Sequence, residues 1–360
     1  MNYKTDASPW RYHALAARWV ALLWSTIAGI HIAAATTFSD IDYRLGDGLH
    51  IPGTGLTLGG YATARYDRPV NTPGSAALDN LSMSIWWESE GRWKFFAEFD
   101  SENTFGSGEI DNGKPYVSLE RMYLDYALND TTSARVGKFL TPIGHWNLVH
   151  ATPLVWTTSR PLTTSDVFPT NATGLMVNGR LHTAGHDLEY SVYASNGSEL
   201  HPNPALDTFS KVFGAHLNIP TLSDVQLGLS YATFEQKHSE GEHKQLVGID
   251  FLWTRNRYEV SAEGVYRFSG KGSAWDERGA FVQAVAPLSA RLYAIGRYEL
   301  YRTALQPAAT QQRIVGLNCR ITQAIVLKAE WITTQNNRVG AQNIRIGSPE
   351  GFTSSVSVLF

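Results

Sequence analysis

Apolar and polar residues alternate in short runs along most of the chain. Between residues 81 and 88 apolar side chains occupy every second position from Leu81 to Trp87, and residues 93–100 repeat the pattern after a tight Ser-Glu-Gly-Arg turn. Alternation with a period of two places one kind of side chain on each face of a β-strand. Two such runs around a tight turn therefore predict a β-hairpin with one apolar and one largely polar face.

The same unit recurs to the end of the sequence and gives about sixteen predicted strands of roughly 8 to 11 residues, the length that a tilted strand needs to cross a bilayer. Short turns alternate with longer polar links, among them residues 67–80, 101–116 and 137–174. The fold predicted is all-β, a transmembrane antiparallel β-barrel with short periplasmic turns and long external loops. The predicted strands are residues 56–66, 81–88, 93–100, 121–126, 133–139, 175–181, 188–194, 213–219, 225–234, 247–253, 258–267, 279–286, 291–301, 314–321, 325–333 and 352–360.

A soluble β-sandwich or barrel would alternate in the same way. However, no segment with a helical period is available to cover so many apolar strand faces. Aromatic residues also recur at the predicted strand ends, where a membrane barrel carries two interfacial girdles. The candidates for these girdles are Tyr66, Trp87, Trp93, Tyr126, Trp253, Tyr258, Tyr298, Trp331 and Phe360.

The N-terminus has the pattern of an export signal. Arg11 and Arg18 precede an apolar run from Trp19 to Ile32, and three alanines follow the run. The run is shorter than the ~20 residues that a membrane-spanning helix needs, and small residues after it are typical of a signal-peptide cleavage site. We expect residues 1–35 to be a removed signal peptide and residues 36–360 to form the barrel, with a retained anchor or a buried helix as the alternatives.

Composition narrows the possible chemistry. The formal net charge is -3 and the sequence pI is about 6.4, so a nucleic-acid partner is not expected. The single cysteine, Cys319, excludes an intramolecular disulfide and a cysteine-based metal site. We predict no cofactor and no bound metal.

One long segment, residues 137–174, follows neither the strand nor the helix period and contains four prolines. It comes after the fifth predicted strand and is therefore the third long loop, about residues 140–173. Long irregular segments in regular folds are often functional, and we expect this loop to fold into the barrel and narrow it. Arg160 would meet anionic solutes, and His145 and His150 would add pH dependence, or the same side chains would only fix the loop to the wall. The full set of candidates at the constriction is Arg160, His145, His150, Asp166 and Trp156.

Three stretches resemble Gram-negative outer-membrane porins of about sixteen strands, including the phosphate-selective O and P group. They are the opening strand LGGYATARYD, the junction RVGKFLTPIG at residues 135–144, and the last strand SVSVLF, which ends in an aromatic residue. The resemblance implies an outer-membrane location, contact with membrane lipid and lipopolysaccharide, a homotrimer, and an inward third loop. It also implies that Phe360 is the signal read by the barrel-assembly machinery.

Strand parity predicts which charged residues face the lumen, which stays an aqueous channel in a barrel of this size. Facing charges of both signs would filter ions, or would form structural ion pairs that hold the wall together. The predicted pore-lining residues are Arg65, Lys94, Glu98, Arg121, Asp125, Arg135, Arg267, Arg297, Glu299, Lys328 and Glu330.

The predicted function is a porin for the passive diffusion of small hydrophilic solutes or ions, filtered by the third loop and the lumen charges. An enzyme is not expected, because the sequence lacks a GxSxG elbow, a P-loop and an HExxH motif. His145 and His150 are five residues apart in a proline-flanked loop, which does not suit a metal site. The alternative is a barrel-anchored outer-membrane enzyme or adhesin without a conducting pore.

Overall fold

The computed structural model describes residues 42–360, except 108–115, 150, 166, 184–185, 198, 203–205, 223, 305, 307, 337, 340–343 and 346. Within these residues no helix is long and apolar enough to span a membrane. The predicted signal peptide, residues 1–35, lies outside the described residues.

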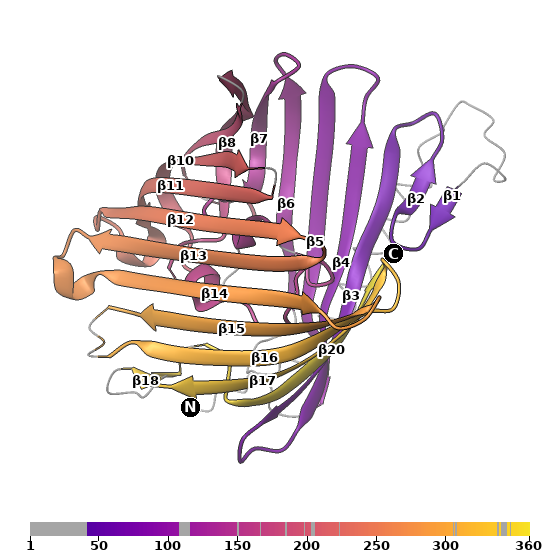
Figure 1. Ribbon diagram of the computed structural model, residues 1–360. Helices are drawn as coiled ribbons and strands as arrows, with labels where there is room; N and C mark the ends of the chain where they lie inside the picture. Colours follow the sequence, from indigo (N-terminus) through magenta and orange to yellow (C-terminus); the bar gives the residue numbers. More distant parts are fainter. Residues whose placement is uncertain are drawn as a thin grey trace, which may run out of the picture. The chain divides into compact units, whose positions relative to one another are not determined.

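Sixteen antiparallel strands of the described chain form a closed barrel, which confirms the predicted fold (Figure 1). Each strand pairs with the next in sequence, and the last, β20, closes the circle by pairing with both β17 and β3. The barrel strands are β3 (Leu56–Pro69), β4 (Ser75–Glu88), β5 (Trp93–Ser107), β6 (Tyr116–Ala127), β7 (Thr132–Leu140), β8 (Asn171–Thr183), β9 (His186–Asn196), β10 (Phe209–Leu222), β11 (Val225–Gln236), β12 (Lys244–Arg255), β13 (Tyr258–Ser269), β14 (Glu277–Pro287), β15 (Leu292–Arg302), β16 (Thr310–Arg320), β17 (Ile325–Gln335) and β20 (Gly351–Leu359).

Several strands are longer than predicted, and this removes one of the expected long links. Residues 67–80 were expected to be a loop, but β3 continues to Pro69 and β4 begins at Ser75. The polar residues responsible for that expectation belong to the inner wall, where Asp67 pairs with Arg65 at 2.7 Å. A shift in register between Leu78 and Asn80 also breaks the alternation locally.

The segment before the first barrel strand forms a small hairpin. Strand β2 (Gly48–Ile51) pairs with β1 (Asp42–Arg44) and with the beginning of β3. The remaining short elements lie in the loops: η2 (Trp146–Leu148), α2 (Leu162–Ser165), η3 (Lys237–Ser239), η4 (Ser273–Trp275), β18 (Arg338–Val339) and β19 (Ile344–Arg345).

The last strand ends at the short-turn end of the barrel, beside the opening strand. Phe360 N–H donates to the carbonyl of Gly60 at 2.9 Å, and Gly60 N–H donates back to the carbonyl of Phe360 at 2.8 Å. This arrangement agrees with the even number of strands. It fixes the backbone of Phe360 and says nothing about a role in assembly, which stays a prediction.

The outward face of the barrel exposes large apolar side chains around its circumference. A soluble protein rarely exposes so much contiguous apolar surface, whereas a membrane barrel presents such a band to hydrocarbon. The exposed residues include Met83, Val136, Leu175, Phe213, Leu229, Val247, Ile249, Val282, Val315, Leu317, Trp331 and Val356.

A small apolar core lies inside the barrel toward the long-loop end. Phe139 of β7 is fully buried there against Ile143 and Val167 from the following loop. The inward aromatic rings of Tyr193 and Phe234 complete this packing from β9 and β11. The interior is therefore partly filled by the connection between β7 and β8.

Candidate functional site

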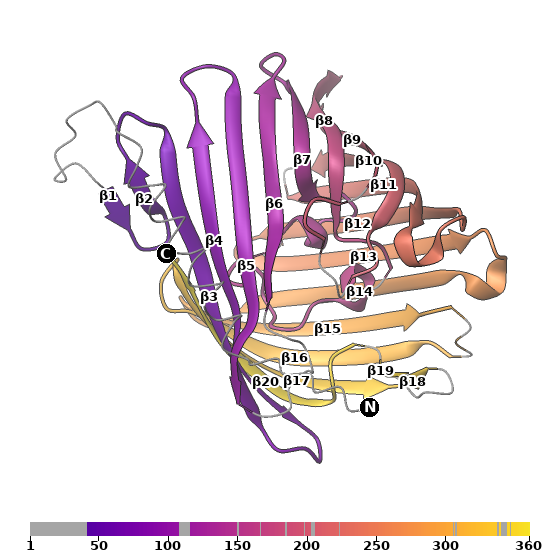
Figure 2. The same ribbon diagram turned by 180° about the vertical axis from the view of Figure 1, so that it is seen from behind.

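The connection between β7 and β8, residues 141–170 and hereafter loop 3, lies inside the barrel (Figure 2). It turns inward at Gly144, whose φ of +68° is readily adopted only by glycine. Directly after this turn Trp146 N–H donates to Glu263 Oε1 of β13 at 2.5 Å, and Gly144 N–H donates to Ser230 Oγ of β11 at 3.2 Å. The predicted inward fold of this loop is therefore observed.

The middle of loop 3 is held by side chains that reach its backbone carbonyls. Lys328 Nζ donates to the carbonyls of Thr152 at 2.5 Å and Thr157 at 3.1 Å. Asn318 Nδ2 donates to the carbonyl of Trp156 at 2.9 Å. A buried backbone carbonyl needs a hydrogen-bond donor. These inward polar side chains supply donors to the carbonyls of a loop that has almost no secondary structure of its own.

Arg297 of β15 makes the most extensive contact with loop 3. Its Nη1 donates to Thr157 Oγ1 at 2.6 Å, its Nη2 donates to Ser159 Oγ at 2.7 Å, and its Nε donates to Glu299 Oε1 at 2.7 Å. Glu299 Oε2 in turn accepts Leu162 N–H at 2.7 Å. Both members of the ion pair therefore bond loop 3. Their side chains are 0% exposed at Arg297 and 1% exposed at Glu299.

These contacts define a covered wall, the inward faces of β13 to β17 beneath loop 3. Five of the predicted pore-lining residues lie there and are almost completely buried: Arg267 at 7%, Arg297 at 3%, Glu299 at 1%, Lys328 at 4% and Glu330 at 3% exposure. They face inward as strand parity requires. Their assignment to the open pore is corrected, because loop 3 covers them and they hold it in place.

The opposite part of the inner surface, formed by β4 to β9 toward the short turns, is an open wall where several charged side chains keep contact with solvent. Arg135 pairs with Asp125 at 2.7 Å, and Arg121 pairs at 2.6 Å with Glu98, which is itself buried. Lys94 and its partner Glu88 are each 53% exposed. A shallow pocket of about 490 Å³ follows this wall toward the short turns.

A row of aromatic side chains crosses the open wall and was not identified from the sequence. Trp86, Phe96 and Tyr123 are register partners on β4, β5 and β6. Arg135 lies over the Tyr123 ring at 3.6 Å and Arg121 over the Phe96 ring at 4.6 Å, which are cation–π distances. The sequence did contain a signal for this row. The three aromatic residues occupy positions that the alternation assigns to the polar, inward face of their strands.

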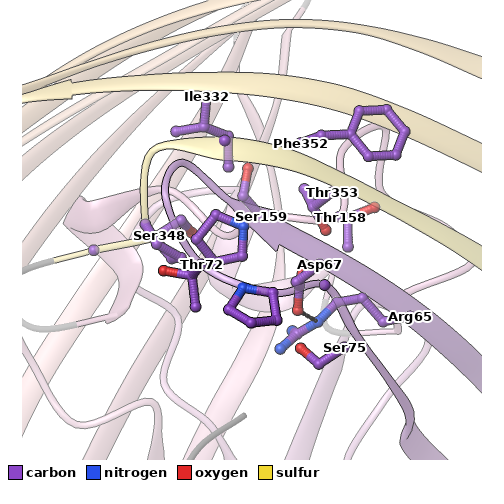
Figure 3. Close-up of a pocket in the computed structure, with 16 residues that line it drawn as sticks. Arg65, Asp67, Thr72, Ser75, Thr158, Ser159, Ile332, Ser348, Phe352 and Thr353 are labelled. Carbon is purple, nitrogen blue, oxygen red and sulfur yellow. Dashed lines mark hydrogen bonds and ion pairs between the residues drawn. The ribbon is translucent and has the colours of Figure 1, made fainter. Parts of the chain in front are cut away.

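Loop 3 approaches the wall again at β3 and β20, where it bounds a cavity of about 900 Å³ (Figure 3). Thr158 and Ser159 form the loop side of this cavity, and Arg65 and Asp67 lie on the wall side. Arg65 pairs with Asp67 at 2.7 Å and with Asp79 at 3.0 Å. Thr158 and Ser159 were not among the predicted constriction residues, since hydroxyl side chains in a loop carry no distinctive pattern.

The described constriction candidates have three different surroundings. Arg160 lies over the ring of Trp146 of the same loop, with its Cζ 5.7 Å from the ring centroid. Trp156 packs between Tyr293 at 4.9 Å and Arg320 at 4.5 Å, against the wall. His145 is half-buried beside Glu263, and burial lowers the pKa of His145 below its ordinary value. His150 and Asp166 lie outside the described residues.

Within the described residues no three His, Cys, Asp or Glu side chains gather closely enough to hold a metal ion.

No known protein family's sequence profile matches the chain. A relative in sequence, an uncharacterized protein of Aquifex aeolicus (strain VF5), is 29% identical over 147 residues, which are 40% of this chain and 32% of that protein. The chain thus matches about a third of the length of that relative.

Solved porins share the fold. The anion-selective porin from Comamonas acidovorans gives a TM-score of 0.58 at 12% identity over 85% of this chain and 98% of that one. OmpF of Salmonella typhi, in complex with daunomycin, gives 0.60 at 10% identity over 86% and 98%. The outer membrane channel DcaP of Acinetobacter baumannii gives 0.55 at 11% identity over 85% and 97%. The fold is therefore that of the sixteen-stranded outer-membrane porins, as the sequence resemblance implied.

Proposed function

We propose that this chain is an outer-membrane porin, a water-filled channel for the passive diffusion of small hydrophilic solutes or ions. The observation that carries the proposal is the open wall. At the short-turn mouth of the closed barrel the inward Arg180 and Glu189 side chains remain 64% and 47% exposed. Further along the same wall Arg135 and Asp125 keep 21% and 17%, and we infer a water-filled lumen beside them. An apolar outward face and a wet, charged inner wall are the two properties of a porin.

Loop 3 is proposed to set the size limit of the channel. It covers one side of the lumen and leaves the passage between itself and the open wall. Selection then comes from the charges that a solute meets along this passage. Arg160 and His145 are proposed to act at its edge, whereas the contacts of Trp156 favour a role in fixing the loop.

Reconstitution into planar bilayers tests the channel directly. Stepwise increases of conductance are expected as single barrels insert. An Arg160→Ala variant is expected to change conductance or ion selectivity, and an unchanged variant would remove Arg160 from the proposal while leaving the channel intact. A barrel that inserts but stays electrically silent would instead favour a membrane-anchored enzyme or adhesin.

The finer expectations from the resemblance belong to the same proposal. The chain is proposed to act without catalysis, to assemble as a homotrimer, and to use Phe360 as a signal for the barrel-assembly machinery after export. Cross-linking and mass determination in mild detergent test the trimer. Deletion of Phe360 tests the signal, and undiminished insertion into the outer membrane would argue against it.

A further inference from the structure

Two arginines stand side by side on the outward face of the barrel at its long-loop end. Arg278 of β14 and Arg302 of β15 are direct register partners across the antiparallel pair. Like charges directly opposite each other destabilise a sheet. Arg302 Nε donates to the carbonyl of Gln306 at 2.9 Å, and among the described residues no ion pair within 4 Å includes Arg278 or Arg302.

The nearest acidic groups are already engaged. Asp276 accepts the Tyr266 hydroxyl and the Ser269 N–H, each at 2.9 Å. Glu277 points to the other side of the sheet, where it pairs with Arg267 at 2.5 Å. These hydrogen bonds come from neutral donors, so Asp276 keeps its charge beside the arginines without forming an ion pair with either. One carboxylate against two guanidinium groups leaves the position with a net positive charge.

An apolar groove begins directly beneath this position. The next outward row across β12 to β15 is Ile249, Gly264, Ala280 and Leu300, in register. Because the two central residues are small and the two outer ones large, the row encloses a groove of about 620 Å³. Tyr266 stacks on Phe268 at 4.5 Å beside the groove, which is the aromatic flank expected at the level of lipid headgroups.

We propose that Arg278 and Arg302 bind a phosphate of an outer-leaflet phosphoglycolipid, lipid A of lipopolysaccharide, and that the groove holds one of its acyl chains. Paired guanidinium forks suit a phosphate dianion, and a basic position above an apolar groove is how membrane proteins hold lipid headgroups. The long-loop end faces the outer leaflet. The inference rests on the proposed outer-membrane location and is independent of conduction.

Free phosphate does not account for the site as a whole. An inorganic anion would use the arginines but not the row of small residues, and a neutral lipid would use the groove but leave the like charges opposed. Only an anionic lipid satisfies both features at once.

The test uses the full-length barrel extracted from outer membranes in mild detergent. Lipid A retained per barrel is counted by mass spectrometry for the wild type and for an R278A/R302A double variant. Loss of two charge-assisted contacts is expected to lower retention roughly tenfold. Ala280→Leu, which fills the groove and keeps both arginines, is expected to lower retention as well.

Arg68→Ala is the matched control, since Arg68 is a single exposed outward arginine at the same end, on β3. It is expected to retain lipid A. Equal losses in the control and the double variant, or full retention in the double variant, would overturn the proposal.

Thermal unfolding of the delipidated barrel separates the sources of phosphate. Lipid A, whose phosphomonoesters are dianionic, is expected to raise the unfolding temperature of the wild type most. Phosphatidylglycerol, a monoanionic phosphodiester, is expected to raise it less, and dephosphorylated lipid A and inorganic phosphate are not expected to raise it. Stabilisation by inorganic phosphate alone would reduce the site to an ion site. A barrel that binds lipid A but never conducts would refute the porin and leave this site standing.

Discussion

The covered wall and the open wall carry the same kinds of ion pair at different degrees of burial. Arg297 and Glu299 pair at 2.7 Å with side-chain exposures of 0% and 1%, whereas Arg135 and Asp125 pair at the same distance with exposures of 21% and 17%. On the open wall the pair faces the lumen and an aromatic ring. On the covered wall it also bonds the backbone and hydroxyls of loop 3.

This difference shows what burial demands of a charge. A desolvated ion pair is tolerated only when further hydrogen bonds satisfy its remaining donors and acceptors, and Arg297 finds them at Thr157 and Ser159. The loop in turn receives partners for backbone groups that a helix or strand would have paired internally. The covered wall therefore holds loop 3 in place, and the open wall is the part of the inner surface that we propose to contact solutes.

Removing one partner of the buried pair should have the largest effect. Arg297→Met leaves Glu299 buried without its counter-charge and frees the middle of loop 3, at an expected cost of ~3–5 kcal/mol in the free energy of unfolding. Arg135→Met on the open wall should cost roughly 1 kcal/mol or less. Urea unfolding of both variants in lipid vesicles, followed by tryptophan fluorescence, measures the contrast. Equal costs would mean that the two walls do not differ as described.

The turn into the lumen should be the next most sensitive point. At Gly144 a Cβ would lie 2.4 Å from Glu263 Oε2, on a backbone with φ +68°. Gly144→Ala is expected to cost ~1–3 kcal/mol through backbone strain and to make single-channel current noisier as the loop loses its first anchor. Gly296→Ala is the control, since nothing lies within 4 Å of its added Cβ. If the current through Gly144→Ala is as quiet as that through the wild type, the turn at Gly144 is not needed to hold loop 3 in position.

Period-two alternation was sufficient to predict every barrel strand, because each strand separates an apolar membrane side from a polar lumen side. Strand ends were predicted too short, since inward polar residues such as Asp67 resemble loop residues in sequence. Counting strands also placed loop 3. Strand parity placed both Arg297 and Arg135 on the inner face of the barrel. The path of loop 3 makes the difference between them, because the loop covers Arg297 and leaves Arg135 in contact with solvent. That path depends on contacts such as Arg297 to Ser159, which are 138 residues apart in the chain.

Reversing a charge on the open wall should alter selectivity and leave stability nearly unchanged. A unit charge 4 Å from a passing ion contributes ~1 kcal/mol in water, which is roughly fivefold in local ion concentration. Arg180→Glu should therefore shift the reversal potential in a salt gradient toward cations. Arg255→Glu, an outward change at the end of β12 with a similarly exposed side chain, should not. A shift of equal size in both variants would show that the open wall does not line the passage.

The smallest expected effect is the pH dependence of loop 3 through His145. Burial lowers the pKa of this imidazole, so its neutral form is favoured in the folded loop. The unfolded chain takes up the proton first as pH falls, and the stabilisation present above about pH 6.5 is lost as pH falls through the lowered value. The facing groups are His216, Asp250 and Glu263.

Acidification below pH 6.5 should therefore increase loop-related current fluctuations modestly, since one half-buried imidazole is involved. His145→Gln, which cannot titrate, should flatten this part of the profile and leave only the dependence due to the three facing groups. A profile identical to that of the wild type would assign the whole pH response to these three wall groups and none to the loop itself.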